Sequence, residues 1–190
     1  MPQGEETHGH VPPMESSEEA SSKQLTYARR QGDTLQDAID AMLKMDRHSQ
    51  ERRAGEFLVS CVVEDAEGMW VPRDDGALEW EEPDEQNLHV EVLVRDGADR
   101  RFIPGLRVTL TLIGPDGNEI GTHEQPFLWH PWLFHYGRNW KVPGDGEYRA
   151  RIHIDAPSFA RHDHRNGKRY ARPVDVELGP IHVETGRKAS

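Results

Sequence analysis

From residue 56 onward, apolar and polar residues alternate in short runs that are typical of β-strands. The run 88–95 shows this most clearly, because every second residue is Leu or Val and the residues between them include His, Glu and Arg. Gly-rich and Asp-rich turns, such as Gly114-Pro115-Asp116-Gly117, separate these runs. The pattern predicts seven or eight short strands, and therefore an antiparallel β-sandwich. The predicted strands are 57–64, 69–71, 88–95, 108–113, 119–123, 147–155, 174–178 and 180–184.

The segment before these strands has a different pattern. Residues 1–24 are rich in Glu, Ser, Pro and His, and this composition predicts disorder. Residues 33 to about 53 have apolar side chains at helical spacing, and Asp33 or Thr34 could cap the helix. We therefore divide the chain into a disordered, acidic and histidine-bearing tail (1–24), an amphipathic helix segment (25–54) and a β-sandwich domain (55–190).

The overall charge excludes one class of partner. The formal net charge is -11, which argues against binding to nucleic acid or to an anionic membrane surface. The basic residues are mostly arginine, and lysine is scarce. An acidic chain of this kind is compatible with a halophilic source, although coding from GC-rich DNA would produce the same arginine bias.

Cys61 is the only cysteine, so neither an intramolecular disulfide nor a thiolate metal cluster can form within one chain. It lies in the apolar run 57–63, which predicts a buried and unreactive thiol. No stretch has the apolar length needed to span a bilayer. Residues 1–30 also lack the apolar region of a secretory signal. Two interpretations stay open: an intracellular protein, or an export segment outside this sequence.

Histidines and one carboxylate form the most informative chemical pattern. His89 and Glu91 are two residues apart in a predicted strand, so their side chains lie on one face of it. His135 and His162 follow later, each beside aromatic or acidic residues. Three separated histidines and a carboxylate suit a borderline divalent metal, provided that the fold brings them together.

Residues 125–140 do not alternate and hold three of the five tryptophans. Pro126 and Pro131 favour an irregular loop over a strand, and the aromatic content indicates either a core plug or an interface. His130, in this segment, is expected to form hydrogen bonds within it. His153 lies among charged residues of another strand, and we expect it on a solvated face.

The order of several short fragments resembles that of bacterial periplasmic iron-transport proteins, which accompany an iron permease. The resemblance extends from about Phe57 to Val176. It implies an immunoglobulin-like β-sandwich that binds copper and iron, is usually a homodimer, and is exported to the cell surface or periplasm. It also implies metal ligands at His89, His135 and His162, with Glu91 as a nearby or direct ligand. The fragments are Gly68-Met69, His89-Val90-Glu91, Gly121-Thr122, His135-Tyr136-Gly137, Gly146-Glu147-Tyr148, Arg161-His162 and Asn166-Gly167.

One departure from the family pattern concerns the metal. The family has a Met-Pro-Met-like segment before His-Tyr-Gly, whereas this chain has Gln125-Pro126-Phe127, so the soft sulfur ligand is missing. His123 or His130 could replace it, or the site could use imidazole and carboxylate alone. Such a site suits Cu(II), Fe(II), Zn(II) or Mn(II) better than Cu(I).

We therefore expect a metal-binding protein of an iron-uptake system, with iron, copper or both as the ion and zinc or manganese still open. A membrane iron permease is the expected macromolecular partner. No Ser-His-Asp, cysteine-nucleophile or paired-carboxylate motif indicates an enzyme. One alternative is an immunoglobulin-like interaction module whose aromatic loop binds a protein or a carbohydrate. Another is a metal-dependent oxidase or hydrolase with an open coordination position.

Overall fold

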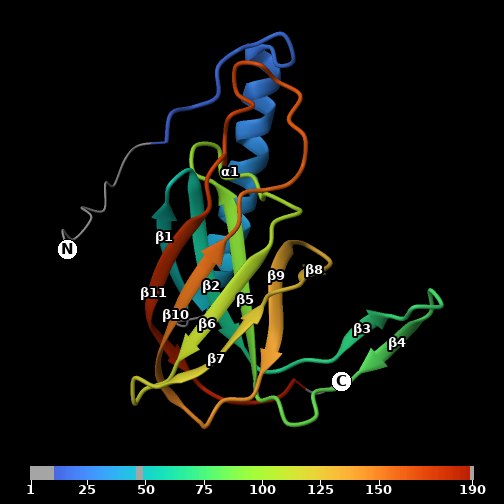
Figure 1. Ribbon diagram of the computed structural model, residues 1–190, viewed down its shortest axis with the longest axis vertical. Helices are drawn as coiled ribbons and strands as arrows, with labels where there is room; N and C mark the ends of the chain where they lie inside the picture. The colour runs from blue at the N-terminus through green and yellow to red at the C-terminus, as the bar shows by residue number, and fades with distance from the viewer. Residues whose placement is uncertain (1–10, 46–48, 189–190) are drawn as a thin grey trace.

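The computed structural model describes residues 11–45 and 49–188, and it is a two-sheet antiparallel β-sandwich preceded by one helix (Figure 1). The mainly β fold predicted from the sequence is thereby confirmed. One sheet has the order β1 (Ser49–Ala54), β2 (Phe57–Glu64), β5 (Leu88–Asp96), β9 (Phe134–Trp140) and β8 (Phe127–Trp129). The other has the order β11 (Val174–Val183), β10 (Gly146–Ile154), β6 (Val108–Ile113) and β7 (Glu119–Glu124).

The hydrophobic core lies between the two sheets and explains the alternation in the sequence. On β5, Val90, Val92 and Val94 are fully buried and face the four-stranded sheet, where they pack with residues such as Leu110 and Ile152. Burial of each side chain of this size contributes about 1.5–3 kcal/mol. The intervening residues of β5 therefore face away from this core.

The outer face of the five-stranded sheet is covered in part by helix α1 (Ser22–Met45), which lies behind β2 and β5 in Figure 1. Ile39 of the helix is fully buried against Val62, Leu93 and Leu133. This second, smaller apolar cluster makes the outer face of β5 a buried surface rather than a solvated one. Leu93 of β5 belongs to this cluster, and all nine residues of β5 are buried.

The helix and the strand after it differ from the sequence expectation. The helix begins at Ser22 rather than at residue 33, and a reciprocal cap supports this start: the Ser21 backbone N–H donates to Gln24 Oε1 at 2.8 Å. Residues 49–54, expected to continue the helix, instead form β1 and pair with β2. β1 is a polar edge strand without apolar alternation, so its sequence carries no strand signal.

Residues 11–21 also differ from the expected disorder. The Glu15 N–H donates to Asn166 Oδ1 at 3.0 Å, and Ser17 Oγ donates to Asp163 Oδ2 at 2.7 Å. Val11 is buried. Polar hydrogen bonds to the loop before β11 supply the order that apolar packing cannot. Residues 1–10 lie outside the described residues, and the division at residues 24 and 54 stays a prediction.

The aromatic segment forms two strands, β8 and β9, although an irregular loop was expected. Pro126 precedes β8 and Pro131 falls in the turn between the strands, so neither proline interrupts a ladder. A further hairpin, β3 (Met69–Pro72) with β4 (Leu78–Glu81), projects away from the sandwich (Figure 1). Within the described residues, no helix is long and apolar enough to cross a membrane.

Candidate metal centre

His89, Glu91 and His135 meet on the outer face of the five-stranded sheet. Each offers one ligand atom, and these atoms lie within 4.8 Å of one another, with all three residues buried. The strand register produces this arrangement, because β5 pairs with β9 so that His89 lies opposite Asn139 and Glu91 opposite Gly137. Three of the four predicted site residues therefore come together within one chain.

The distances fit a small metal ion. His135 Nε2 lies 3.5 Å from Glu91 Oε1, and the two imidazole rings are 5.8 Å apart at 83° to each other. Ligand atoms placed tetrahedrally about 2.1 Å from an ion lie about 3.4 Å apart. The separation of His135 Nε2 and Glu91 Oε1 is therefore close to that of two ligands of one ion.

Both imidazoles are held in the neutral form that binds metals. Burial, together with the charge of the neighbouring His89, lowers the pKa of His135 to about 4. Burial also lowers the pKa of His89, against the opposing influence of Glu67 and Asn139. Because metal ions compete with protons for imidazole nitrogen, neutral rings at pH 7 favour binding.

Asn139 determines which nitrogen of His89 is available. Its amide nitrogen donates to the Glu67 carbonyl at 2.7 Å, so its Oδ1 faces His89 Nδ1 at 2.9 Å as an acceptor. Nδ1 must carry the proton in this contact, which leaves the Nε2 lone pair for a metal. His89 Nε2 and both ring nitrogens of His135 are buried without a hydrogen-bond partner among the described residues.

Gly137 leaves the space between the two histidines. A Cβ atom at this position would lie 3.1 Å from His89 Nε2 and 3.0 Å from His135 Cδ2. It would also lie 2.9 Å from the Val90 carbonyl oxygen. The space that a side chain at position 137 would fill is therefore free. Together with the unpartnered ring nitrogens, this space fits a bound ion.

His162, the fourth predicted ligand, lies elsewhere in the chain. It is in the loop between β10 and β11, its side chain is 92% exposed, and its Nδ1 is 3.1 Å from Glu19 Oε1. The structure therefore does not bring it to the other three residues within one chain. Its role as a ligand stays a prediction that needs a second copy of the protein.

The two histidines considered as substitutes for the missing methionine have different positions. His130 lines the same cleft as His135, a cavity of about 640 Å³, and its Nδ1 has no hydrogen-bond partner among the described residues. His123 is on β7 of the other sheet, with its ring 4.9 Å from that of Trp140. Of the two, only His130 borders the candidate centre.

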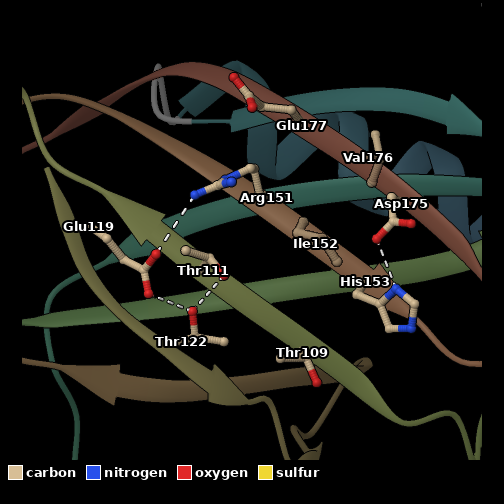
Figure 2. Close-up of a pocket in the computed structure, with 10 residues that line it drawn as sticks. All are labelled: Thr109, Thr111, Glu119, Thr122, Arg151, Ile152, His153, Asp175, Val176 and Glu177. Atoms are coloured by element: carbon tan, nitrogen blue, oxygen red, sulfur yellow. Dashed lines mark hydrogen bonds and ion pairs between the residues drawn. The ribbon is translucent and has the colours of Figure 1, made fainter. Parts of the chain in front are cut away.

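His153 lies on the solvated outer face of the other sheet, as expected. It lines a hollow of about 610 Å³, and its Nδ1 is 2.8 Å from Asp175 Oδ1. Figure 2 shows this contact with Asp175. The hydrogen bond to Asp175 is the main cause of a raised pKa for His153. Nearby, Arg151 pairs with Glu119, which also accepts a hydrogen bond from Thr122. These side chains pair with one another, which is typical of a surface charge ladder.

Sequence reasoning missed three residues around the centre. Gly137 and Asn139 follow His135 at steps of two, and this period was a strand signal that could have placed them on the face of His135. Glu67, whose Oε1 lies 3.7 Å from His89 Nε2, carries no comparable signal. It approaches the site through a tertiary contact that local spacing does not reveal.

A comparison with family descriptions matches residues 76–179 to the family described as Fe2+ transport protein. That range is more than half of the chain. The chain belongs to this family. The matched range contains His89, Glu91 and His135, while helix α1 and hairpin strand β3 lie before it. Among curated proteins, a search found no match.

Solved structures share the fold at low sequence identity. FetP from uropathogenic Escherichia coli strain F11, expressed in the periplasm, is 20% identical over 73% of this chain and 95% of its own, with a TM-score of 0.58. A copper-bound variant of FetP is 18% identical over 75% and 94%, also with a TM-score of 0.58. A copper-bound variant of Campylobacter jejuni P19 is 15% identical over 74% and 98%, with a TM-score of 0.57. The likeness confirms the β-sandwich architecture.

Proposed function

We propose that this chain binds a divalent iron or copper ion at His89, Glu91 and His135, as the cargo of an iron-uptake system. The observation that carries this proposal is the set of buried, neutral imidazole nitrogens that face one another without hydrogen-bond partners among the described residues. Burying such groups costs about 1–3 kcal/mol each unless a ligand engages them. Membership of the Fe2+ transport family and the copper-bound FetP and P19 variants support the same assignment.

Replacing His135 tests this proposal directly. His135→Ala should lower the affinity for Co(II), Zn(II) and Cu(II) by on the order of 100-fold, because it removes a ligand from the centre. His153→Ala is the matched control, since it removes an imidazole from the other sheet and should leave binding unchanged. Isothermal titration of metal-free protein measures both. If His153→Ala loses binding and His135→Ala does not, the wrong histidines are assigned.

A carrier role is favoured over catalysis, although the three residues leave coordination positions open. A carrier holds and releases its ion without turnover, whereas an oxidase would oxidise many equivalents of Fe(II) or Cu(I) per chain. For a carrier, we expect no more than one equivalent of Fe(II) or Cu(I) to be oxidised per site. Oxygen uptake by the metal-loaded protein measures this, and sustained uptake would instead identify an oxidase.

We also propose a homodimer in which His162 of one copy completes the centre of the other. The support is the exposure of His162 and the family resemblance, which implies dimers, an exported protein and a membrane iron permease as partner. His162→Ala should then weaken metal binding only at protein concentrations where the dimer forms. Sedimentation velocity with and without Co(II) gives the oligomeric state. A monomer with unchanged binding would exclude this role for His162.

A second candidate function is an interaction module, and exposed aromatic side chains favour it. Trp129 is 70% exposed on the edge strand β8, and several other aromatic residues are exposed near it or on the β3–β4 hairpin. Clusters of this kind are typical of surfaces that bind proteins or carbohydrates. Partner binding by the metal-free protein distinguishes the two functions, since an interaction module would bind its partner equally well without metal. The exposed residues are Trp70, Trp80, Phe127, Trp132 and Phe134.

A further inference from the structure

One acidic residue stands at the rim of the metal centre without a place in the His-x-Glu motif. Glu67, between β2 and β3, has Oε1 3.7 Å from His89 Nε2, while its Oε2 accepts a hydrogen bond from Lys188 Nζ at 3.0 Å. Its side chain is only 24% exposed. Each oxygen of this carboxylate therefore faces a different group, one a metal-binding nitrogen and the other a cation of the protein itself.

Hydrogen bonds hold the backbone of both Glu67 and Lys188 in place. The Glu67 N–H donates to Asn139 Oδ1 at 3.3 Å, and the Glu67 carbonyl accepts from Asn139 Nδ2 at 2.7 Å. Because the same Asn139 contacts His89, it sets the position of Glu67 relative to that ring. Lys188 is held as well, since its N–H donates to the Ala66 carbonyl at 2.8 Å.

The distance from Glu67 to His89 is close to that between two ligands of one ion, about 3.4 Å. Glu67 and His135 also line the same cleft. Glu67 nevertheless stands just outside the group of atoms that lie within 4.8 Å of one another. Its hydrogen bond to Lys188 accounts for this position, because it keeps the carboxylate turned partly away from the centre.

We propose that Glu67 is a further metal ligand, held in reserve by Lys188 and released when a divalent cation enters. This inference rests on the proposed function, and it specifies which metal ions the centre would bind. Two carboxylates and two neutral imidazoles balance a charge of +2, so the four-residue site together with its ion carries no net charge. Lys188 keeps a partner after the exchange, because its ammonium group also contacts Glu64.

This donor set determines which ion the centre prefers. Carboxylate and imidazole suit divalent ions such as Fe(II), Co(II), Zn(II) and Cu(II), whereas Cu(I) prefers thioether and thiolate. A monovalent ion would also leave the four-residue site with a net negative charge. Both Glu67 and Lys188 lie outside the range 76–179 that matches the family. The proposed cargo is thus a divalent ion rather than Cu(I).

Paired substitutions test the exchange with Co(II) as the probe. Glu67→Gln should lower Co(II) affinity about tenfold or more and change the visible absorption of the bound ion, because one ligand is lost. Lys188→Ala should raise the affinity about two- to fivefold without changing the spectrum, because a competing cation is removed. Glu85→Gln and Lys141→Ala are matched controls, since they break a similar Glu–Lys pair, 2.8 Å apart, at an exposed site.

The outcomes separate this inference from the proposed function. An unchanged Co(II) affinity and spectrum for Glu67→Gln would overturn the inference, provided that His135→Ala weakens Co(II) binding as proposed. A loss of affinity in both Glu67→Gln and Lys188→Ala would also overturn it, because that result indicates a purely structural ion pair. A wild-type protein without Co(II) binding would contradict the proposed function itself. Thermal unfolding of each variant establishes that it is folded.

Discussion

The residue that lies opposite His135 on the neighbouring strand is Leu128, on β8. Phe127, the last residue of the segment Gln125-Pro126-Phe127, instead pairs with Tyr136 and stacks on Phe134 at a ring distance of 5.4 Å. Directly opposed residues of an antiparallel pair have their side chains on the same face. Leu128 is therefore the position from which a side chain of β8 reaches the metal centre.

This register leads to a prediction at the residue scale. Leu128→Met should raise Cu(I) affinity about tenfold or more, because it places a soft thioether beside His135. Phe127→Met is the matched control, and it should have little effect, because its side chain belongs to the opposite face. Competition with a Cu(I) chelator measures both variants. A stronger gain for Phe127→Met would show that the strand register is wrong.

At the scale of elements, helix α1 is joined to the sheet through a buried arginine and an apolar contact. Arg95 is fully buried on β5, where it donates to Gln36 Oε1 of the helix at 2.6 Å and to Ser60 Oγ at 2.9 Å, and it pairs with Glu51 of β1. Ile39 lies one turn further along the helix, fully buried against the sheet. The helix is thus part of the folded unit.

Truncation of Ile39 tests this docking. Ile39→Ala should lower the free energy of unfolding by about 2–4 kcal/mol, and Ile39→Val by about 1 kcal/mol, since the two remove different numbers of buried methyl and methylene groups. Urea denaturation followed by far-ultraviolet circular dichroism measures both. A change below 0.5 kcal/mol for Ile39→Ala, on the order of a surface substitution, would mean that the helix contributes little to stability.

The elements differ in how far the sequence could predict them. β5 was predicted well because valines on one face and His, Glu and Arg on the other give a clear period of two. β9 was missed, because its aromatic residues and the nearby prolines hide the same alternation. β1 was missed because its residues are polar on both faces. Glu67 could not be predicted, since only the tertiary contact of its turn with Asn139 brings it to the centre.

At the scale of the whole molecule, buried neutral histidines make stability depend on pH. In the metal-free protein the pKa of His135 is about 4, against about 6.5 in the unfolded chain. Between these values the unfolded chain binds more protons, so the free energy of unfolding falls as the pH is lowered from 6.5 toward 4. For His135 alone the full difference is on the order of 3 kcal/mol.

Urea denaturation of the protein with a chelator at pH 7, 6 and 5 measures this dependence. We expect stability to decline over this range, and His135→Gln should make the decline shallower, because the titrating group is gone. His153→Gln is the control, and it should make the decline in stability toward low pH steeper rather than shallower. The pKa of His153 is raised by Asp175, so its stabilising effect is present at low pH and lost as the pH rises. Equal declines in all three proteins would contradict the assignment.

On strands β5 and β9, the residues that pack in the core alternate with the residues of the metal centre. Val90, Val92 and Tyr136 fill the core, while His89, Glu91 and His135 alternate with them on the outer face. A ligand on the outer face can therefore be replaced, one position at a time, without any change in the core residues. A lineage could change its metal through a few substitutions on one face and keep the same architecture.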